Sequence, residues 1–336
     1  MATIIGIPGV SDILLGTSKD DILFGYSGND TMYSFGGNDI LDSSDGDDGL
    51  IGGAGNDTLI NAIGESYMDG GEGDDFLDAG DSRDVMYGGN GNDFMDGGNG
   101  NDFMNGGEGD DVMNGNNGND FINAGNGINI LSGGDGDDLI LGGTFIDIAY
   151  GDGGNDKLIG NLGVDVLNGG DGNDFISGNE DGDLLFGGNG KDTIIGESGD
   201  DLINGGLGKD ILKGGTGADR FIFNSPTEGI DTITDFGLIE LPVNNTTGQG
   251  DIIILTPMFF GDELTSKEGL NPLEADQFVI GTAAVSSSDR LIYNSTNGNL
   301  YFDSDGVGGA NQIQFANLLS NPTLTSSNFF VGISPS

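Results

Sequence analysis

The chain of 336 residues contains no cysteine, histidine or tryptophan, and only 9 lysine and arginine residues stand against 56 aspartate and glutamate residues. Without cysteine and histidine, the sequence excludes disulfides, thiolate nucleophiles, imidazole bases and the usual ligands of zinc and copper. The formal net charge of −47 predicts repulsion from nucleic acid and from anionic membranes. Such an excess of negative charge would keep a chain expanded unless cations bind to it.

Long apolar runs and a leader sequence are missing as well. No run of 18 apolar residues occurs, so we expect no transmembrane helix and no membrane insertion. The N-terminal residues MATIIGIPGVSDILLG lack a basic region and an A-x-A cleavage site, which argues against a cleaved secretory signal. The motifs G-x-S-x-G and G-x-x-x-x-G-K-[ST] do not occur either, and we expect no enzymatic activity.

Glycine is present in excess, and its distribution divides the chain, because 56 of the 68 glycines precede residue 223. From Ile7 to Ile222, 24 nonapeptides follow one another without insertion, with the consensus G-G-x-G-x-D-x-U-x, where U is apolar. Position six is Asp except at Ser66 and Asn129, and position eight is always apolar. Plain disorder, the alternative for such a composition, does not explain an apolar residue at every ninth position. The sequence therefore predicts two domains, residues 1–222 and 223–336.

The consensus predicts the fold of the first domain. The triplet x-U-x suits a three-residue strand with U facing inward, and G-G-x-G-x-D suits a turn in which glycine supplies positive φ. Two nonapeptides then make one coil, and stacked coils form two parallel sheets around a thin core. We expect an all-β chain, in which a parallel β-roll, a two-sheet solenoid, is followed by a small antiparallel β domain.

The position-six carboxylates recur on the same edge of this roll at every second nonapeptide, next to the carbonyl oxygens of the turns. Oxygen ligands in an irregular shell favour Ca²⁺, since Mg²⁺ demands a tighter octahedron. With each ion between one repeat and the second repeat after it, Asp93 shares its ions with Asp75 and Asp111, and about 18–22 calcium ions fit the array. The expected carboxylate ligands are Asp30, Asp39, Asp48, Asp57, Asp75, Asp84, Asp93, Asp102, Asp111, Asp120, Asp138, Asp156, Asp165, Asp174, Asp183, Asp192, Asp201, Asp210 and Asp219.

The best turns read GGNGND (88–93 and 97–102), GGEGDD (70–75 and 106–111) and GGDGDD (133–138), and this array resembles the RTX, or haemolysin-type, calcium-binding β-roll. In that family, carbonyls of positions one to four bind calcium beside the position-six carboxylate. The resemblance implies further ligands at Gly89, Gly91, Gly98, Gly100, Gly106, Glu108, Gly115 and Asn117. The turns AIGES, AGNGIN and GGTFID depart from the pattern, so the resemblance gives no ligand set around Ser66, Asn129 and Phe145.

The second predicted domain, residues 223–336, has few glycines and lacks the nonapeptide repeat. Its segments EGIDTITDF, GDIIIL and LIYNSTNGNLYFDSDG resemble the C-terminal domain that follows the roll in serralysin-like secreted proteins. The resemblance implies that the domain caps the roll and that type I secretion machinery reads an uncleaved signal in NFFVGISPS. The runs Ile230–Phe236 and Leu300–Phe302 are typical of antiparallel strands, and residues 241–250 of an exposed loop.

Two features of the sequence leave alternatives open. Asp303-Ser-Asp305-Gly is half of an EF-hand loop, and we favour a solvated β-turn there over an additional Ca²⁺ site. Position seven, expected to point outward, holds Phe76, Phe94, Phe103, Phe121 and Phe175. Stacking of these side chains along each sheet is favoured over lateral association through them.

Together these features predict a secreted, non-enzymatic Ca²⁺-binding protein that folds outside the cell and acts at the cell surface, as an adhesive or layer component. The expected partners are calcium ions, the type I secretion machinery and either a second copy or a cell-surface glycan. The alternatives are the secretion and folding module of a larger secreted hydrolase, and a calcium buffer or sensor. The repeat register begins within a few residues of Met1, which favours the first hypothesis over the module.

Overall fold

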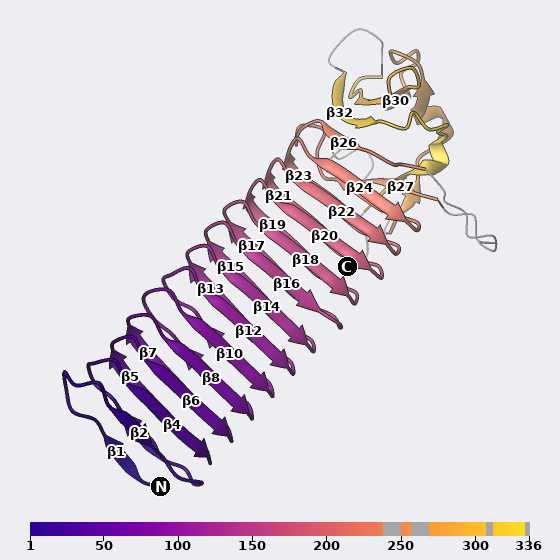
Figure 1. The fold of residues 1–336 in the computed structure, drawn as a ribbon. Helices are drawn as coiled ribbons and strands as arrows, with labels where there is room; N and C mark the ends of the chain where they lie inside the picture. The colour runs from indigo at the N-terminus through magenta and orange to yellow at the C-terminus, as the bar shows by residue number, and fades with distance from the viewer. Residues whose placement is uncertain (238–249, 257–268, 307–311, 333–336) are drawn as a thin grey trace. The chain divides into compact units, whose positions relative to one another are not determined.

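The computed structural model describes residues 1–237, 250–256, 269–306 and 312–332. These residues form two compact units, residues 1–171 and 172–336, and both are built from β-strands (Figure 1). Within the ranges described, no helix has the length and apolar character needed to cross a membrane. The all-β fold class predicted from the sequence is confirmed.

In the first unit, successive strands alternate between two parallel sheets, which Figure 1 shows as neighbouring rows of arrows. One sheet contains β1 (Thr3–Ile5), β3 (Ile22–Phe24), β5 (Ile40–Asp45), β7 (Thr58–Ile63), β9 (Phe76–Asp78), β11 (Phe94–Asp96), β13 (Val112–Asn117), β15 (Ile130–Asp135), β17 (Ile148–Gly153) and β19 (Val166–Gly172). The other contains β2 (Ile13–Leu15), β4 (Thr31–Gly36), β6 (Gly49–Ala54), β8 (Tyr67–Glu72), β10 (Val85–Asn90), β12 (Phe103–Glu108), β14 (Phe121–Asn126), β16 (Leu139–Gly143) and β18 (Lys157–Leu162).

Each strand pairs with the next strand but one along the chain, so two nonapeptides make one coil as the repeat predicts. Met95 lies opposite Met113 in one sheet, and Met86 lies opposite Met104 in the other. The position-eight side chains fill the space between the sheets, since every one from Leu14 to Phe221 is buried. The predicted inward face is confirmed, and the core is one side chain deep on each sheet.

Most strands are longer than predicted. The triplet x-U-x predicts three residues, whereas β12 has six because the glycines of the next repeat continue the pairing. Gly107 stays in register with Gly89 although their φ angles are 111° and 116°. Only glycine adopts such angles without strain, and a Cβ on Gly107 would lie 2.1 Å from the Gly89 carbonyl oxygen. The prediction that G-G-x-G-x-D is a turn throughout is therefore wrong for its first three positions.

The position-seven side chains face outward, as predicted, and stack on one another along each sheet. The rings of Phe76 and Phe94 lie 5.2 Å apart and 2° from parallel. Phe103 and Phe121 lie 5.1 Å apart and 5° from parallel. Phe76 and Phe94 are both 39% exposed, so these rows cover the sheets without being buried themselves. The structure thus shows the favoured stacking.

The second unit begins with the same alternation and ends in a mixed arrangement. One sheet follows the order β20 (Phe175–Glu180), β22 (Thr193–Ser198), β24 (Ile211–Thr216), β26 (Asp231–Ile233), β32 (Ile313–Leu318), β31 (Asn299–Phe302), β30 (Leu291–Asn294) and β29 (Phe278–Ile280). The other follows β21 (Leu184–Gly190), β23 (Leu202–Gly208), β25 (Arg220–Phe223), β27 (Ile252–Leu255), β33 (Phe329–Val331) and β28 (Asn271–Pro272). Two short 3₁₀ helices, η2 (Ala275–Gln277) and η3 (Ser326–Asn328), lie between strands.

Antiparallel strands are present after residue 222, as predicted, in the pairs β30–β31, β31–β32 and β28–β33. The prediction is wrong for the run Ile230–Phe236, because β26 is parallel to both β24 and β32. The reason is that β26 and β27 continue the two parallel sheets past the last nonapeptide. Residues 241–249 of the expected loop lie outside the described ranges.

The chain forms a tight turn at Asp303, as the sequence analysis favoured, but the Asp303 side chain is buried rather than solvated. The Asp303 Oδ1 atom accepts hydrogen bonds from the backbone of Asp305 (3.1 Å) and Gly306 (2.9 Å). Asp303 is fully buried, and its own N–H donates to the Arg290 carbonyl next to β30. Val307, which follows in the half EF-hand pattern, lies outside the described residues.

Candidate metal centre

Within each unit, position-six aspartates form a row along each edge of the stacked coils. In each row, the Oδ1 atom accepts the backbone N–H of the position-six residue one coil earlier. Asp93 Oδ1 accepts from Asp75 (2.8 Å), and the Asp93 N–H donates to Asp111 Oδ1 (2.8 Å). On the other edge, the Asp84 N–H donates to Asp102 Oδ1 at 2.8 Å. The neighbours predicted from two nonapeptides per coil are therefore the neighbours in the structure.

The second oxygen of these carboxylates is buried and has no hydrogen-bond partner. This holds for the Oδ2 atoms of Asp30, Asp39, Asp48, Asp57, Asp75, Asp84, Asp93, Asp102, Asp111, Asp120, Asp138, Asp192, Asp201, Asp210 and Asp219. Asp156, Asp165, Asp174 and Asp183 occupy the same position and are buried too. An ionised oxygen buried without a partner costs several kcal/mol. The rows therefore need either bound cations or protons.

Glycine at position one leaves the space that faces this oxygen. A Cβ on Gly88 would lie 2.3 Å from Asp93 Oδ2 and 2.7 Å from the carbonyl oxygen of Gly106 in the next coil. A Cβ on Gly106 would lie 2.3 Å from Asp111 Oδ2 and 2.5 Å from the Ala124 carbonyl oxygen. Carboxylate and carbonyl oxygens thus converge on a space that any side chain would fill. Such a donor set fits Ca²⁺.

Two turns that depart from the consensus satisfy the second oxygen with the protein itself. In GGTFID, Asp147 Oδ2 accepts the backbone N–H of Gly143 at 2.6 Å. In GTSKDD, Asp21 Oδ2 accepts both the N–H and the hydroxyl of Thr17 at 2.7 Å. Asp84 Oδ2 has no partner although its turn, AGDSRD, also departs from the consensus. The buried oxygens without a partner, in consensus turns and in others, are therefore the structural sign of ion binding.

The two substituted residues at position six continue the row without a charge. Ser66 Oγ donates to Asp84 Oδ1 at 2.7 Å. Asn129 Oδ1 accepts from the Asp111 N–H at 2.8 Å, and its Nδ2 donates to Asp147 Oδ1 at 2.8 Å. The ladder of hydrogen bonds therefore tolerates Asn, whereas an ion would lose a carboxylate there.

Position five forms a second, exposed row that runs in the opposite direction. Asp74 Oδ1 accepts the N–H of Asn92, one coil later, at 2.9 Å. Asn92 Oδ1 in turn accepts the N–H of Asp110 at 2.8 Å. Asp and Asn alternate here because the bond requires only an acceptor. The negative charge is thus maintained at position six and is dispensable at position five.

The predicted glycine ligands fall into two groups. Gly106 and Gly115, at position one, lie beside the Oδ2 atoms of Asp111 and Asp120. The glycines at positions two and four, namely Gly89, Gly91, Gly98 and Gly100, join neighbouring coils through backbone pairing. The Gly91 N–H, for example, donates to the Glu108 carbonyl at 2.7 Å.

Glu108 and Asn117, the predicted ligands at position three, do not place their side chains at the Oδ2 atoms. Glu108 is exposed and accepts from Asn126 Nδ2 at 2.8 Å, and Asn117 is exposed and donates to Asn99 Oδ1 at 2.7 Å. Over the described ranges, three acidic side chains never gather into a group that could hold a metal ion. Backbone carbonyls must therefore complete each site.

The sequence register misses two aspartates that extend the rows. Asp231 Oδ1 accepts the Asp210 N–H at 3.1 Å, and Asp251 Oδ1 accepts the Asp219 N–H at 3.3 Å. They lie 21 and 32 residues after their partners, so a fixed nine-residue period does not reach them. The signal that could have found Asp231 is EGIDTIT, which matches positions three to nine of the repeat once an insertion is allowed.

Burial raises the pKa of most of the position-six carboxyls. The pKa of Asp57, Asp93, Asp138 and Asp201 is raised to about 6, and that of Asp75, Asp84, Asp102, Asp111, Asp192 and Asp219 to about 7. Desolvation is the main cause, and the N–H donated from the preceding coil lowers the pKa only in part. Protons and calcium therefore compete for these oxygens.

This competition predicts a pH dependence of the calcium-free chain. Carboxyls with a folded pKa above the ordinary 3.8 stabilise the fold below about pH 4, and that stability is lost as the pH rises through 6–7. We expect more strand structure at pH 5 than at pH 8 when calcium is chelated, measured by far-UV circular dichroism. Identical spectra at the two pH values would contradict the assignment.

Stacked coils with buried carboxylates facing glycine-lined oxygen pockets define a calcium-binding parallel β-roll. The sequence matches the RTX calcium-binding nonapeptide repeat (4 copies) over residues 9–41, 36–59, 69–104, 96–131, 114–149, 132–167, 150–185, 159–194 and 186–221. These ranges cover more than half of the chain, which belongs to this family, and its cofactor is Ca²⁺. It is a calcium-binding RTX protein of the secreted type. No curated protein matches the chain.

Proposed function

We propose that this RTX protein is a non-enzymatic extracellular protein that leaves the cell unfolded and folds on extracellular Ca²⁺. The observation that carries the proposal is the row of buried Oδ2 atoms without partners in the consensus turns. Sites of modest affinity stay empty at cytosolic calcium levels and fill near millimolar calcium outside the cell. Metal binding would then supply the free energy of folding. The lack of histidine and cysteine supports a role without catalysis.

The C-terminal segment supports export before folding. Phe329, in the segment proposed as the type I secretion signal, is buried in the folded chain. Its strand β33 pairs with β27 in parallel, with Phe329 opposite Ile253. An exporter that reads this segment must therefore read it before β33 joins the sheet.

Co-expression with a type I exporter tests this proposal. The full chain should reach the medium, resist protease in millimolar Ca²⁺ and become sensitive in chelator. A chain without residues 324–336 should stay in the cells, whereas the exposed variant Asp276→Asn should be exported normally. Equal export of the truncated chain would place the signal elsewhere, and protease resistance in chelator would contradict calcium-driven folding. Hydrolysis of protein or ester substrates by the folded chain would contradict the non-enzymatic role.

The exposed aromatic rows support a role at the cell surface, as an adhesive or layer component that binds a second copy or a surface glycan. We expect the variant Phe94→Ser/Phe103→Ser to reduce the light scattering of the folded chain in Ca²⁺. The matched control is Leu207→Ser, because Leu207 is exposed but lies outside the rows. A parent chain that stays monomeric would contradict self-association through these rows.

A further inference from the structure

The chain contains one more turn with the geometry of the repeat, after the last nonapeptide. Gly229 forms a parallel bridge with Gly208, and their φ angles are 158° and 156°. Strand β26 places Ile233 opposite Leu212, and Ile233 is buried in the row of position-eight side chains. Asp231 therefore occupies position six of a further repeat, displaced in phase by three residues.

The space between Asp210 and Asp231 has the same unsatisfied chemistry as the consensus sites. Asp210 is 1% exposed, and its Oδ2 has no hydrogen-bond partner. A Cβ on Gly205 would lie 2.5 Å from this oxygen, as a Cβ on Gly88 would from Asp93 Oδ2. The Asp231 side chain is 3% exposed, and its Oδ1 atom accepts the Asp210 N–H at 3.1 Å.

No cationic side chain compensates this pair within the described part of the chain. Lys213, for example, pairs with Glu197 at 3.3 Å. Glu228 adds to the negative charge, since its carboxylate interacts with both Asp210 and Asp231. Two adjacent buried carboxyls without a counter-charge repel each other in a medium of low dielectric constant.

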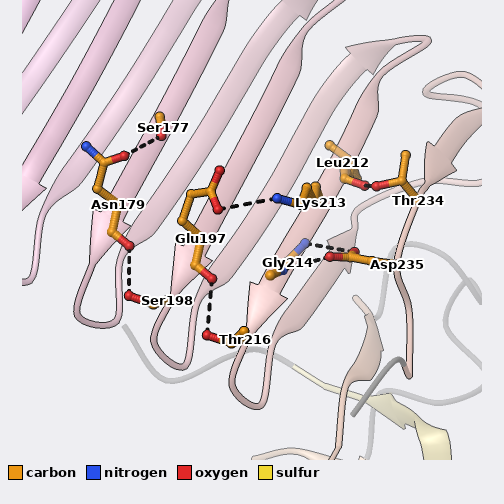
Figure 2. Close-up of polar contacts among 11 residues, drawn as sticks. Ser177, Asn179, Glu197, Ser198, Leu212, Lys213, Gly214, Thr216, Thr234 and Asp235 are labelled. Carbon is orange, nitrogen blue, oxygen red and sulfur yellow. Dashed lines mark hydrogen bonds and ion pairs between the residues drawn. The ribbon is translucent and has the colours of Figure 1, made fainter. Parts of the chain in front are cut away.

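The neighbouring Asp235 has a different role, because both of its oxygens are satisfied. Figure 2 shows its carboxylate against β24, where it accepts from the N–H groups of Gly214 (3.1 Å) and Gly215 (2.9 Å). The hydroxyl of Thr234 donates to the Leu212 carbonyl at 3.2 Å. Hydrogen bonds alone thus hold the segment that follows β26, and the unsatisfied group near it is Asp210 Oδ2.

We propose that Asp210 and Asp231 hold a calcium ion outside the nonapeptide repeats. The site rests on the proposed calcium-driven folding of the repeat array, whose donor chemistry it shares. Carboxylate oxygens in an irregular turn favour Ca²⁺ over Mg²⁺. The ion would join the last coil of repeats to β26 and, through the pairing of Asp231 with Ala316, to β32.

A crystal of the full chain grown in Ca²⁺ tests the site by anomalous scattering. We expect a difference peak beside Asp210 Oδ2 and Asp231, in addition to peaks along the repeats. Peaks along the repeats with none at this position would overturn the Asp210–Asp231 site but not calcium binding by the repeats. A complete absence of peaks in the folded chain would overturn calcium binding by the array as well.

Native mass spectrometry of Asp231→Asn provides the test in solution. We expect one bound ion fewer than in the parent chain, and no change in the matched variant Asp276→Asn, whose side chain is exposed on η2. Asn129 shows that Asn keeps the hydrogen bond of the row, so the variant should fold. An unchanged ion count in folded Asp231→Asn would overturn the proposal.

Discussion

Removing calcium at pH 8 should abolish most of the strand structure of this protein. The core is one side chain deep on each sheet, and it lies between two rows of buried carboxylates, many of which have an Oδ2 atom without a protein partner. At pH 8 the carboxyls with a pKa of about 6–7 ionise and repel their neighbours in the row. The chain should then expand toward a radius of gyration of ~65 Å, as expected for an unfolded chain of this length.

Far-UV circular dichroism and small-angle scattering, with chelator and after calcium is restored, measure this effect. Millimolar Ca²⁺ should restore the strand signal, whereas the same concentration of Mg²⁺ should not, because Mg²⁺ demands an octahedral shell that the turns do not provide. A strand signal that persists at pH 8 in excess chelator would show that the carboxylate rows are stable without ions.

Replacing one buried carboxylate should weaken calcium-dependent folding far more than replacing its exposed neighbour. Asp75→Asn removes a charge from the two sites that Asp75 shares with Asp57 and Asp93, while Asn keeps the hydrogen bonds of the row. We expect this variant to bind one or two fewer calcium ions than the parent chain. Its calcium midpoint of folding should be about tenfold higher, which corresponds to ~1.4 kcal/mol. Calcium titrations followed by circular dichroism and native mass spectrometry measure both quantities.

Asp74→Asn is the matched control, since it makes the same chemical change in the adjacent residue of the same turn. Asp74 lies at position five between Asn56 and Asn92, where Asn already serves as the acceptor. Its calcium midpoint should stay within about twofold of the parent, because surface charges contribute little. Equal shifts for Asp74→Asn and Asp75→Asn would show that calcium responds to net charge rather than to the buried row.

Much of the repeat domain could be predicted from the nine-residue period. A period of two nonapeptides per coil fixes which residues are neighbours, so the pairing of Asp93 with Asp75 and Asp111 followed from sequence alone. The same period predicted which side chains face inward, because position eight is apolar in every nonapeptide. The length of the strands did not, because it depends on whether a glycine such as Gly107, with positive φ, still pairs across the sheet.

The site could be predicted only in part. The consensus located the aspartates, but it does not reveal whether a backbone N–H reaches Oδ2, as Gly143 does in the turn of Asp147. Asp231 was missed because an insertion breaks the register while the strand pairing continues. The burial of Asp303 depends on the hairpin of β30 and β31, which no local pattern shows.

The opposite directions of the rows at positions five and six have a consequence for how such an array can change in length. Each turn reaches the coil before it with its position-six side chain and the coil after it with its position-five side chain. Loss of residues 88–105 would bring the Asp75 N–H to Asp111 Oδ1, so the position-six row would keep its hydrogen bond. At position five the Asp110 N–H would reach Asp74 Oδ1 in place of the Asn92 N–H. The gene can therefore gain or lose segments that encode one whole coil, a pair of nonapeptides, while the two ends of the protein stay as they are.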